Sequence, residues 1–493
     1  MSQQDLSADS ARPPGSSGSG AVPGAPALPS TPGAPTPPGR RPGDWPRPGS
    51  RDRALRADRT RRRATADRLV GLDIARFLAL VGMMGTHVWS TDLDTGEDTI
   101  VTALLSGKAA ALFAVLAGVG IVLTTRRALA DGNAAAARLA VFGRGLALIL
   151  LGLCLGLIPG GVYVIIVYYG VTFWFAIPML RWRIRPLLIT AAVWAVVWPF
   201  VSHLWRSGIG NDVPSPEIGS ASWFDLADPA AFGRGILLTG VYPALTWIVY
   251  VLVGMAIGRG MLAARAAGTL RRFSLVLAGI GAVTAILADR LSALLLGPLG
   301  GVQAIADGLG LGTTRAIEAQ LADGMYGTSP TDSVWWLAGR SPHSGTTLDL
   351  AFTAGIAAAV IGLCLALGLV LSARWRTALM PLTGAGAAPL TVYASHVLLV
   401  AIGDGIAWFV RDDAGWLISS PQLWAAHVVV ALLIGWLIAA THRRGPLETF
   451  VHAAGLALAS AAPPAPPAPP SAEGSQSAGP ARSHPQLGTP RQK

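Results

Sequence analysis

The sequence predicts an all-α integral membrane protein, a bundle of about ten transmembrane helices between disordered Pro/Gly-rich cytoplasmic tails. Three observations lead to this fold class. The chain has 493 residues, of which 52% are hydrophobic and only 13% charged, whereas a soluble protein carries about 25% charged residues. Apolar runs of bilayer-spanning length fill most of the region between Leu69 and Ala440. The connections between these runs alternate between basic and acidic.

The two ends of the chain are predicted to be disordered cytoplasmic tails. Residues 1–67 are basic and rich in Pro, Gly and Ser, and residues 451–493 are rich in Pro and Ala. Such compositions cannot bury a core. The transmembrane domain is therefore expected over residues 68–450. We expect no secretory signal, because the first apolar run is too long for a signal h-region.

Each apolar run is interpreted as a helix, because only a helix satisfies its own backbone at this length in lipid. The predicted spans are 69–89, 107–125, 142–158, 161–180, 187–205, 236–258, 273–295, 349–371, 384–402 and 421–441.

The connecting segments predict the orientation of the chain. Arginines gather after every second span, and the run RDRALRADRTRRRATADR (51–68) precedes the first. Positively charged loops stay in the cytoplasm, so both termini are expected there, in the plasma membrane. The arginines flank spans and form no single patch, which excludes a nucleic-acid partner despite the net charge of +11. The two cysteines, Cys154 and Cys364, lie inside apolar runs and predict no metal site.

The first span carries ionisable residues that bilayer physics does not require. Asp73, Arg76 and His87 lie at positions i, i+3 and i+14, within about 60° of one another on a helix. Asp73 and Arg76 are one turn apart and can pair. Arg76 and His87 are separated by about 16 Å along the axis. Such residues normally face the bundle interior and mark function, so this face is a candidate site.

The pattern of Arg68, Asp73, Arg76 and His87 resembles the opening helix of the family-3 transmembrane acyltransferases and of heparan-α-glucosaminide N-acetyltransferase-like proteins. Phe77 stands where that motif usually has Gly. The segments TGVYPALTWIVYVLVGMAIGR (239–259), PLTVYASH (389–396) and RRGPLE (443–448) resemble the wider group of bacterial multipass proteins in this superfamily. The resemblance implies acyl transfer from a cytoplasmic acyl-CoA to an acceptor at or across the membrane.

Several residues then become candidates for this chemistry. His87 is the first candidate for the catalytic base or acyl carrier, and His396 in the ninth span is the second. For His396, a hydrogen bond that joins two helices is the alternative. A donor anchor is expected on the cytoplasmic side, because guanidinium groups match phosphates; its candidates are Arg68, Asp73, Arg76 and Arg126.

Further candidates lie at the outer ends of other spans. His343 and Asp349 form a histidine–carboxylate pair suited to a general base, or they belong to the capping sequence of the eighth span. Tyr242 and Trp247 open the sixth span; they line an acceptor site or form part of an aromatic belt. Tyr393 joins them as a substrate-binding candidate.

The sequence thus predicts a membrane acyltransferase with no bound cofactor and with acyl-CoA, first of all acetyl-CoA, as co-substrate. Its expected partners are membrane lipid and a glycan or lipid acceptor. The alternative is a non-enzymatic transporter or flippase of a small solute or a lipid-linked substrate, because intramembrane charges and broken helices serve such proteins too.

Overall fold

The computed structural model describes residues 69–91, 98–209, 218–410 and 415–463, all within one compact unit. The predicted tail 1–67, Arg68 and residues 464–493 lie outside the described residues. Within the described ranges the chain is helical and has no β-strand beyond an isolated bridge between Thr91 and Asp98.

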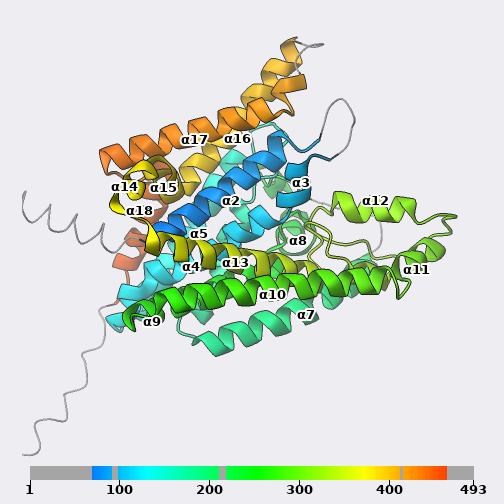
Figure 1. Ribbon diagram of the computed structural model, residues 1–493, viewed down its shortest axis with the longest axis horizontal. Coiled ribbons are helices and arrows are strands. Elements are labelled where there is room, and N and C mark those ends of the chain that lie inside the picture. Colours follow the sequence, from blue (N-terminus) through cyan, green and yellow to red (C-terminus); the bar gives the residue numbers. More distant parts are fainter. Residues whose placement is uncertain (1–68, 92–97, 210–217, 411–414, 464–493) are drawn as a thin grey trace, which may run out of the picture. The chain divides into compact units, whose positions relative to one another are not determined.

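The order of the helices along the chain can be followed by colour in Figure 1. In chain order they are α2 (Val70–Val88), α3 (Ile100–Leu105), α4 (Lys108–Ala130), α5 (Ala134–Leu155), α6 (Ile166–Ala176), η1 (Ile177–Met179), α7 (Ile184–Ile209), η2 (Phe224–Ala227), α8 (Pro229–Arg234), η3 (Gly235–Thr239), α9 (Ala244–Ala266), α10 (Leu270–Leu296), α11 (Gly301–Gly308), α12 (Arg315–Asp323), η4 (Val334–Ala338), α13 (Thr347–Val370), α14 (Ala373–Ala378), α15 (Met380–Ala387), α16 (Pro389–Val410), η5 (Gly415–Leu417), α17 (Pro421–Thr441) and α18 (Pro446–Ser460).

Among the described residues, 8 helical segments are long and apolar enough to cross a bilayer, as in a multi-pass membrane protein. They correspond to eight of the predicted spans. The other two are helical but fall outside this set. Helix α2 has 19 residues and includes Asp73, Arg76 and His87, which lower its apolar character. The predicted span 161–180 is shorter in the structure, because the chain turns through Gly160 and Gly161 and the apolar helical stretch runs only from Ile166 to Met179.

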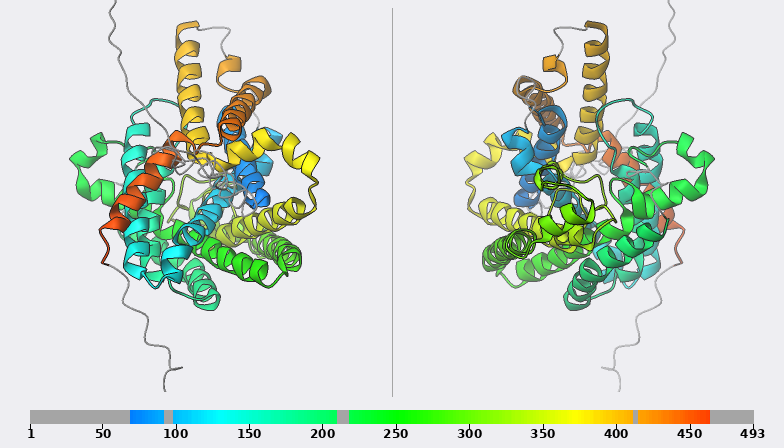
Figure 2. Two further views of the ribbon diagram at one scale, coloured as in Figure 1. Left: turned by 90° about the vertical axis from the view of Figure 1, so that its left-hand side faces the viewer. Right: turned by 90° about the vertical axis from the view of Figure 1, so that its right-hand side faces the viewer.

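Helix α9 lies at the centre of the bundle, and α10 and α17 lie at its periphery. In the apolar window of α9, 72% of residues are buried inside the protein, against 22% for α10 and 17% for α17. The helices α7, α10 and α13 run alongside one another in Figure 1, and Figure 2 views many of the long helices nearly end-on. Small residues permit the close approaches: Gly281 of α10 meets Gly355 of α13 backbone to backbone.

Three predicted boundaries change. The sixth span begins at Ala244, because Gly235–Thr239 forms a π-helical turn that ends before Pro243. The ninth span is broken, as Gly384, Gly386 and Pro389 allow: α15 ends at Ala387 and α16 starts at Pro389. The predicted disordered tail over 451–493 is wrong in its first part, because α18 continues to Ser460 and packs on α5. Gly455 of α18 is buried in this contact, where a Cβ atom would meet Ala140 and Arg144 of α5.

Candidate functional site

His87 and His396 form the centre of the candidate site. His87 sits in the last turn of α2, and its Nδ1 lies 2.9 Å from Nε2 of His396 in α16. The two rings are nearly parallel, with 5.2 Å between their centroids. His396 is buried, at 1% exposure. One of the two nitrogens must donate and the other accept, so each ring fixes the tautomer of its partner.

His427 of α17 also contacts this pair, through the ring of His396. Its ring meets the His396 ring edge-on, with 4.9 Å between centroids. Its Nδ1 lies 2.8 Å from the carbonyl oxygen of Leu423 in its own helix, so Nδ1–H donates to that oxygen. Three histidines from three helices therefore stand in contact. His427 had no explanation at the level of sequence, because only the fold brings α17 beside α16.

A small enclosed cavity lies in front of His87. Its volume is about 20 Å³, enough for one water-sized group. Its polar lining comes from four of the predicted site residues, His87, His343, Tyr242 and Tyr393, and from the start of α4. These residues are distant in sequence, and the fold brings them to one place.

His343 stands in the connection before α13 with a backbone conformation that is rare for a side-chain-bearing residue. Its φ is 57°, in the left-handed region. The ring lies edge-on to Tyr242, with 5.7 Å between centroids, and stacks over Trp247 at 6.3 Å. Burial and the neighbouring charge of Lys108 lower the pKa of His343 to about 4. The structure therefore holds a neutral imidazole in a strained position, as functional sites often do.

Asp349 adjoins His343 through a second cavity, of about 10 Å³, that both residues line. Thr346 Oγ1 accepts the backbone N–H of Asp349 at 3.1 Å, and Asp349 Oδ2 accepts that of Gly345 at 3.0 Å. The predicted capping sequence is thus confirmed. Yet Oδ1 of Asp349 and Nδ1 of His343 are buried and have no hydrogen-bond partner among the described residues. The cap uses Oδ2 of Asp349 and leaves Oδ1 of the same carboxylate available.

The three aromatic candidates line this region. Tyr242 and Trp247 are 6% and 5% exposed, so the aromatic-belt interpretation is wrong for them. Burial among other rings raises the pKa of Tyr242 well above its usual value, so its hydroxyl keeps its proton. The Tyr393 hydroxyl accepts the backbone N–H of Ile165 at 3.4 Å.

Two of the donor-anchor candidates, Asp73 and Arg76, lie near the start of α2, whereas Arg68 lies outside the described residues. Arg76 Nη1 donates to Asp73 Oδ1 at 2.8 Å, which confirms the predicted pairing along the helix. Arg126 is half-buried near the end of α4. Neither arginine lines the His87 cavity. The structure therefore places His87 in the last turn of α2 and the Asp73–Arg76 pair near its start.

Glu448 was not singled out from the sequence, yet it holds the start of α16. Its Oε1 accepts the backbone N–H groups of Leu390 and Thr391 at 2.6 and 3.1 Å, and its Oε2 accepts the Thr391 hydroxyl at 2.6 Å. A carboxylate satisfies the otherwise unpaired first amides of a helix and interacts favourably with its dipole. The segments RRGPLE and PLTVYASH, both noted in the sequence, meet at this contact.

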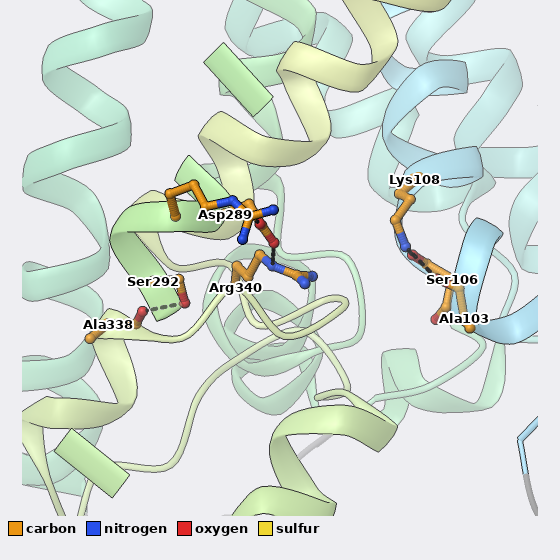
Figure 3. Close-up of polar contacts among 8 residues, drawn as sticks. Ala103, Ser106, Lys108, Asp289, Ser292, Ala338 and Arg340 are labelled. Atoms are coloured by element: carbon orange, nitrogen blue, oxygen red, sulfur yellow. Dashed lines mark hydrogen bonds and ion pairs between the residues drawn. The ribbon is translucent and has the colours of Figure 1, made fainter. Parts of the chain in front are cut away.

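Lys108 and Arg340 were also not predicted. Figure 3 shows Lys108 Nζ donating to the carbonyl oxygens of Ala103 and Ser106, at 3.1 and 3.4 Å. Arg340 pairs with Asp289, which also lies 3.5 Å from Arg290. Both cations approach the ring of Phe352. They place positive charge beside Asp349 and His343.

The helices and this buried polar site define an all-helical, multi-pass membrane protein. No protein-family model matches the chain, and no curated protein matches it. Within the described ranges, no group of three His, Cys, Asp or Glu side chains is placed to hold a metal ion.

Proposed function

We propose that the protein is a membrane acyltransferase that moves an acyl group, most simply acetyl, from a cytoplasmic acyl-CoA to a glycan or lipid acceptor of the cell envelope. The observation that carries the proposal is that His87 and His343 line one small cavity, while Nδ1 of His87 lies 2.9 Å from Nε2 of His396. A histidine held by a second histidine beside a small cavity with a partly polar lining is suited to acid–base catalysis.

In the proposed step, His87 removes the proton of an acceptor hydroxyl or amine. The acceptor oxygen or nitrogen then forms a bond to the acyl carbon, and the bond from that carbon to the sulfur of CoA breaks. The proton on His87 passes to the leaving thiolate. When Nδ1–H of His87 donates to Nε2 of His396, Nε2 of His87 keeps the lone pair that a base needs.

The surrounding residues would bind and orient the acceptor. Tyr242 and Tyr393 line the same cavity as His87. Neutral His343, with Asp349 beyond it, offers a hydrogen-bonding group that does not compete for the proton. The first turn of α4, from Gly107 to Ala110, borders the cavity and adds the positive end of a helix dipole near the developing oxyanion.

We assign the donor to the opposite end of α2. Arg76, with Asp73, Arg68 and Arg126, would hold the phosphates of acyl-CoA at the cytoplasmic side. A long, thin donor arm would then cover the distance of about 16 Å between Arg76 and His87. This arrangement follows the loop charges, which favour cytoplasmic termini in the plasma membrane.

The test is transfer of label from radiolabelled acetyl-CoA in membranes that contain the full chain. We expect label in protein or in an envelope acceptor, and a decrease of about 10²–10⁴-fold in His87→Ala, the usual contribution of a general base. His203→Ala is the matched control, because His203 lies on α7 and lines neither cavity. Full activity in His87→Ala would remove His87 from the chemistry. Absence of label with any acyl donor, together with counterflow of a solute, would favour a transporter.

A further inference from the structure

A large apolar groove with no histidine in its lining lies between four helices. Residues of α7, α9, α10 and α13 enclose a volume of about 510 Å³, within the roughly 300–1,000 Å³ of small-molecule sites. The floor comes from buried residues such as Ala256 and Ala358, and the exposed side chains of Leu188 and Ile280 form the rim. The groove therefore opens sideways from the bundle, toward the bilayer.

The dimensions of the groove match one extended hydrocarbon chain. Its lining runs from Ile184 to Ala195 on α7, from Val249 to Gly260 on α9 and from Phe273 to Thr284 on α10. At 1.5 Å per residue, each stretch is about 16 Å long. This is about half of the ~30 Å thickness of the hydrocarbon core. Alanine and glycine make up half of the lining, so the missing side-chain volume creates the space.

The apolar lining of the groove favours a hydrocarbon chain as the bound group. No charged residue lines the groove, and Thr284, its one hydroxyl, bonds the carbonyl oxygen of Ile280 in its own helix at 2.9 Å. A polar arm with amide groups would lose its hydrogen bonds with water here and find no replacement partners. A hydrocarbon chain loses none and gains close packing.

The two ends of the groove differ. At one end the Phe273 ring packs against Gly260 and closes the space with an apolar surface. At the other end stands Leu350, which is fully buried and also lines the His343–Asp349 cavity. The methyl end of a chain suits the first, and the end that carries a polar head group suits the second.

We propose that this groove binds a single long acyl chain of the lipid acceptor, with the head-group end at Leu350 beside the His343–Asp349 cavity and the methyl end at Phe273. The assignment of this lipid as acceptor rests on the proposed function. The binding of the chain does not.

Photocrosslinking of the full chain in phosphatidylglycerol vesicles tests the binding without any acyl donor. One lipid carries a diazirine near its ester and another carries it at the end of the chain. We expect the first to label peptides around Leu350 and Ala195, and the second to label peptides around Phe273 and Ile184. Reversed order, or even labelling of all lipid-facing helices including α16 and α17, would overturn the proposal.

Filling the groove gives the second readout. Ala354→Phe narrows it from α13, and Ala192→Phe narrows it from the exposed rim of α7, where folding is not at risk. Both should reduce groove labelling severalfold. Ala282→Phe is the matched control, because Ala282 is exposed on α10 and does not line the groove. Unchanged labelling in both filled variants would contradict an acyl-chain site.

The two proposals fail in different ways. If no acyl transfer occurs with any donor but ordered groove labelling persists, the proposed function is wrong and the lipid site stands. If acyl transfer occurs while labelling is even over the lipid-facing helices, the lipid site is wrong and the function stands. When both hold, Ala354→Phe should reduce transfer to lipid severalfold, and Ala282→Phe should not.

Discussion

Nδ1 of His87 and Nε2 of His396 lie 2.9 Å apart, although 309 positions separate the two residues in sequence. His87 reaches the cavity, whereas His396 is buried behind it and does not line it. In the proposed mechanism, His396 is therefore a positioning residue for His87. The contact confirms the interpretation of His396 as a hydrogen bond that joins two helices, and its catalytic role stays a prediction.

Replacing His396 should lower turnover and leave acceptor binding nearly unchanged. His396→Ala leaves the buried nitrogen of His87 without its partner, at about 1–3 kcal/mol, which corresponds to a decrease of about 10–100-fold in kcat. His396→Gln, whose neutral amide can still bond His87, should recover part of this loss. The measurement is steady-state acyl transfer, with kcat separated from KM. Ser395→Ala is the control on the same helix, since Ser395 bonds only the carbonyl oxygen of Thr391. An equal loss in the Ala and Gln variants would argue against positioning.

Glu448 should stabilise the protein through α16. Glu448→Ala removes the acceptor of two backbone amides and of the Thr391 hydroxyl, a loss of about 1–3 kcal/mol for groups left unsatisfied. Thermal unfolding in detergent should therefore show a lower Tm. Glu448→Gln keeps one carbonyl oxygen and should lose less.

Glu318→Ala is the control for this effect, because Glu318 is exposed on α12 and accepts one hydrogen bond from Thr314. If Glu448→Ala and Glu318→Ala unfold at the same temperature as the unchanged protein, the cap contributes nothing to stability.

The sequence predicted those structural features that depend only on residues close together in the chain. Hydropathy located the eight long apolar helices, and helical spacing predicted the bond between Asp73 and Arg76. The Ser/Thr/Asp run before α13 predicted the cap that Thr346 forms. In each case the partners lie within a few residues of each other, so the helix geometry alone fixes their distance.

Contacts between distant segments could not be predicted in this way. His87 and His396 were each candidates, but no spacing rule relates α2 to α16. In the sequence, Glu448 looks like an ordinary acidic residue in the first turn of α18. In the structure it caps the start of α16 instead. Tyr242 and Trp247 are residue types that are common in the aromatic belt at a membrane surface. Only the packing of the segment before α13 shows that they are buried.

His343 should make stability depend on pH. Its pKa is lowered to about 4 by burial, with a contribution from Lys108, against about 6.5 in an unfolded chain. Between these values the unfolded state binds more protons, so stability rises with pH. Stability is fully present above about pH 6.5 and is lost as the pH falls toward 4. His343→Asn, which tolerates the left-handed backbone, should flatten the dependence of Tm on pH in this window.

The matched control is His442→Asn. His442 shares the left-handed conformation, with φ 52°, but is exposed at the end of α17. Its variant should keep the pH dependence of the unchanged protein. The same slope in His343→Asn and the unchanged protein would exclude His343 as its source.

Gly386 should be essential for the approach of α15 to α2. A Cβ atom there would collide with the carbonyl oxygen of Asp73, a backbone atom that cannot rotate away. Gly386→Ala must therefore move one helix, at about 1–3 kcal/mol for an overpacked site, and Tm should fall. Gly279→Ala on α10 is the control, because no atom lies within 4 Å of its Cβ position. That change should raise Tm slightly, since alanine favours a helix by about 0.5–1 kcal/mol over glycine. A Tm that is equal in the two variants would mean that α15 and α2 separate at no cost.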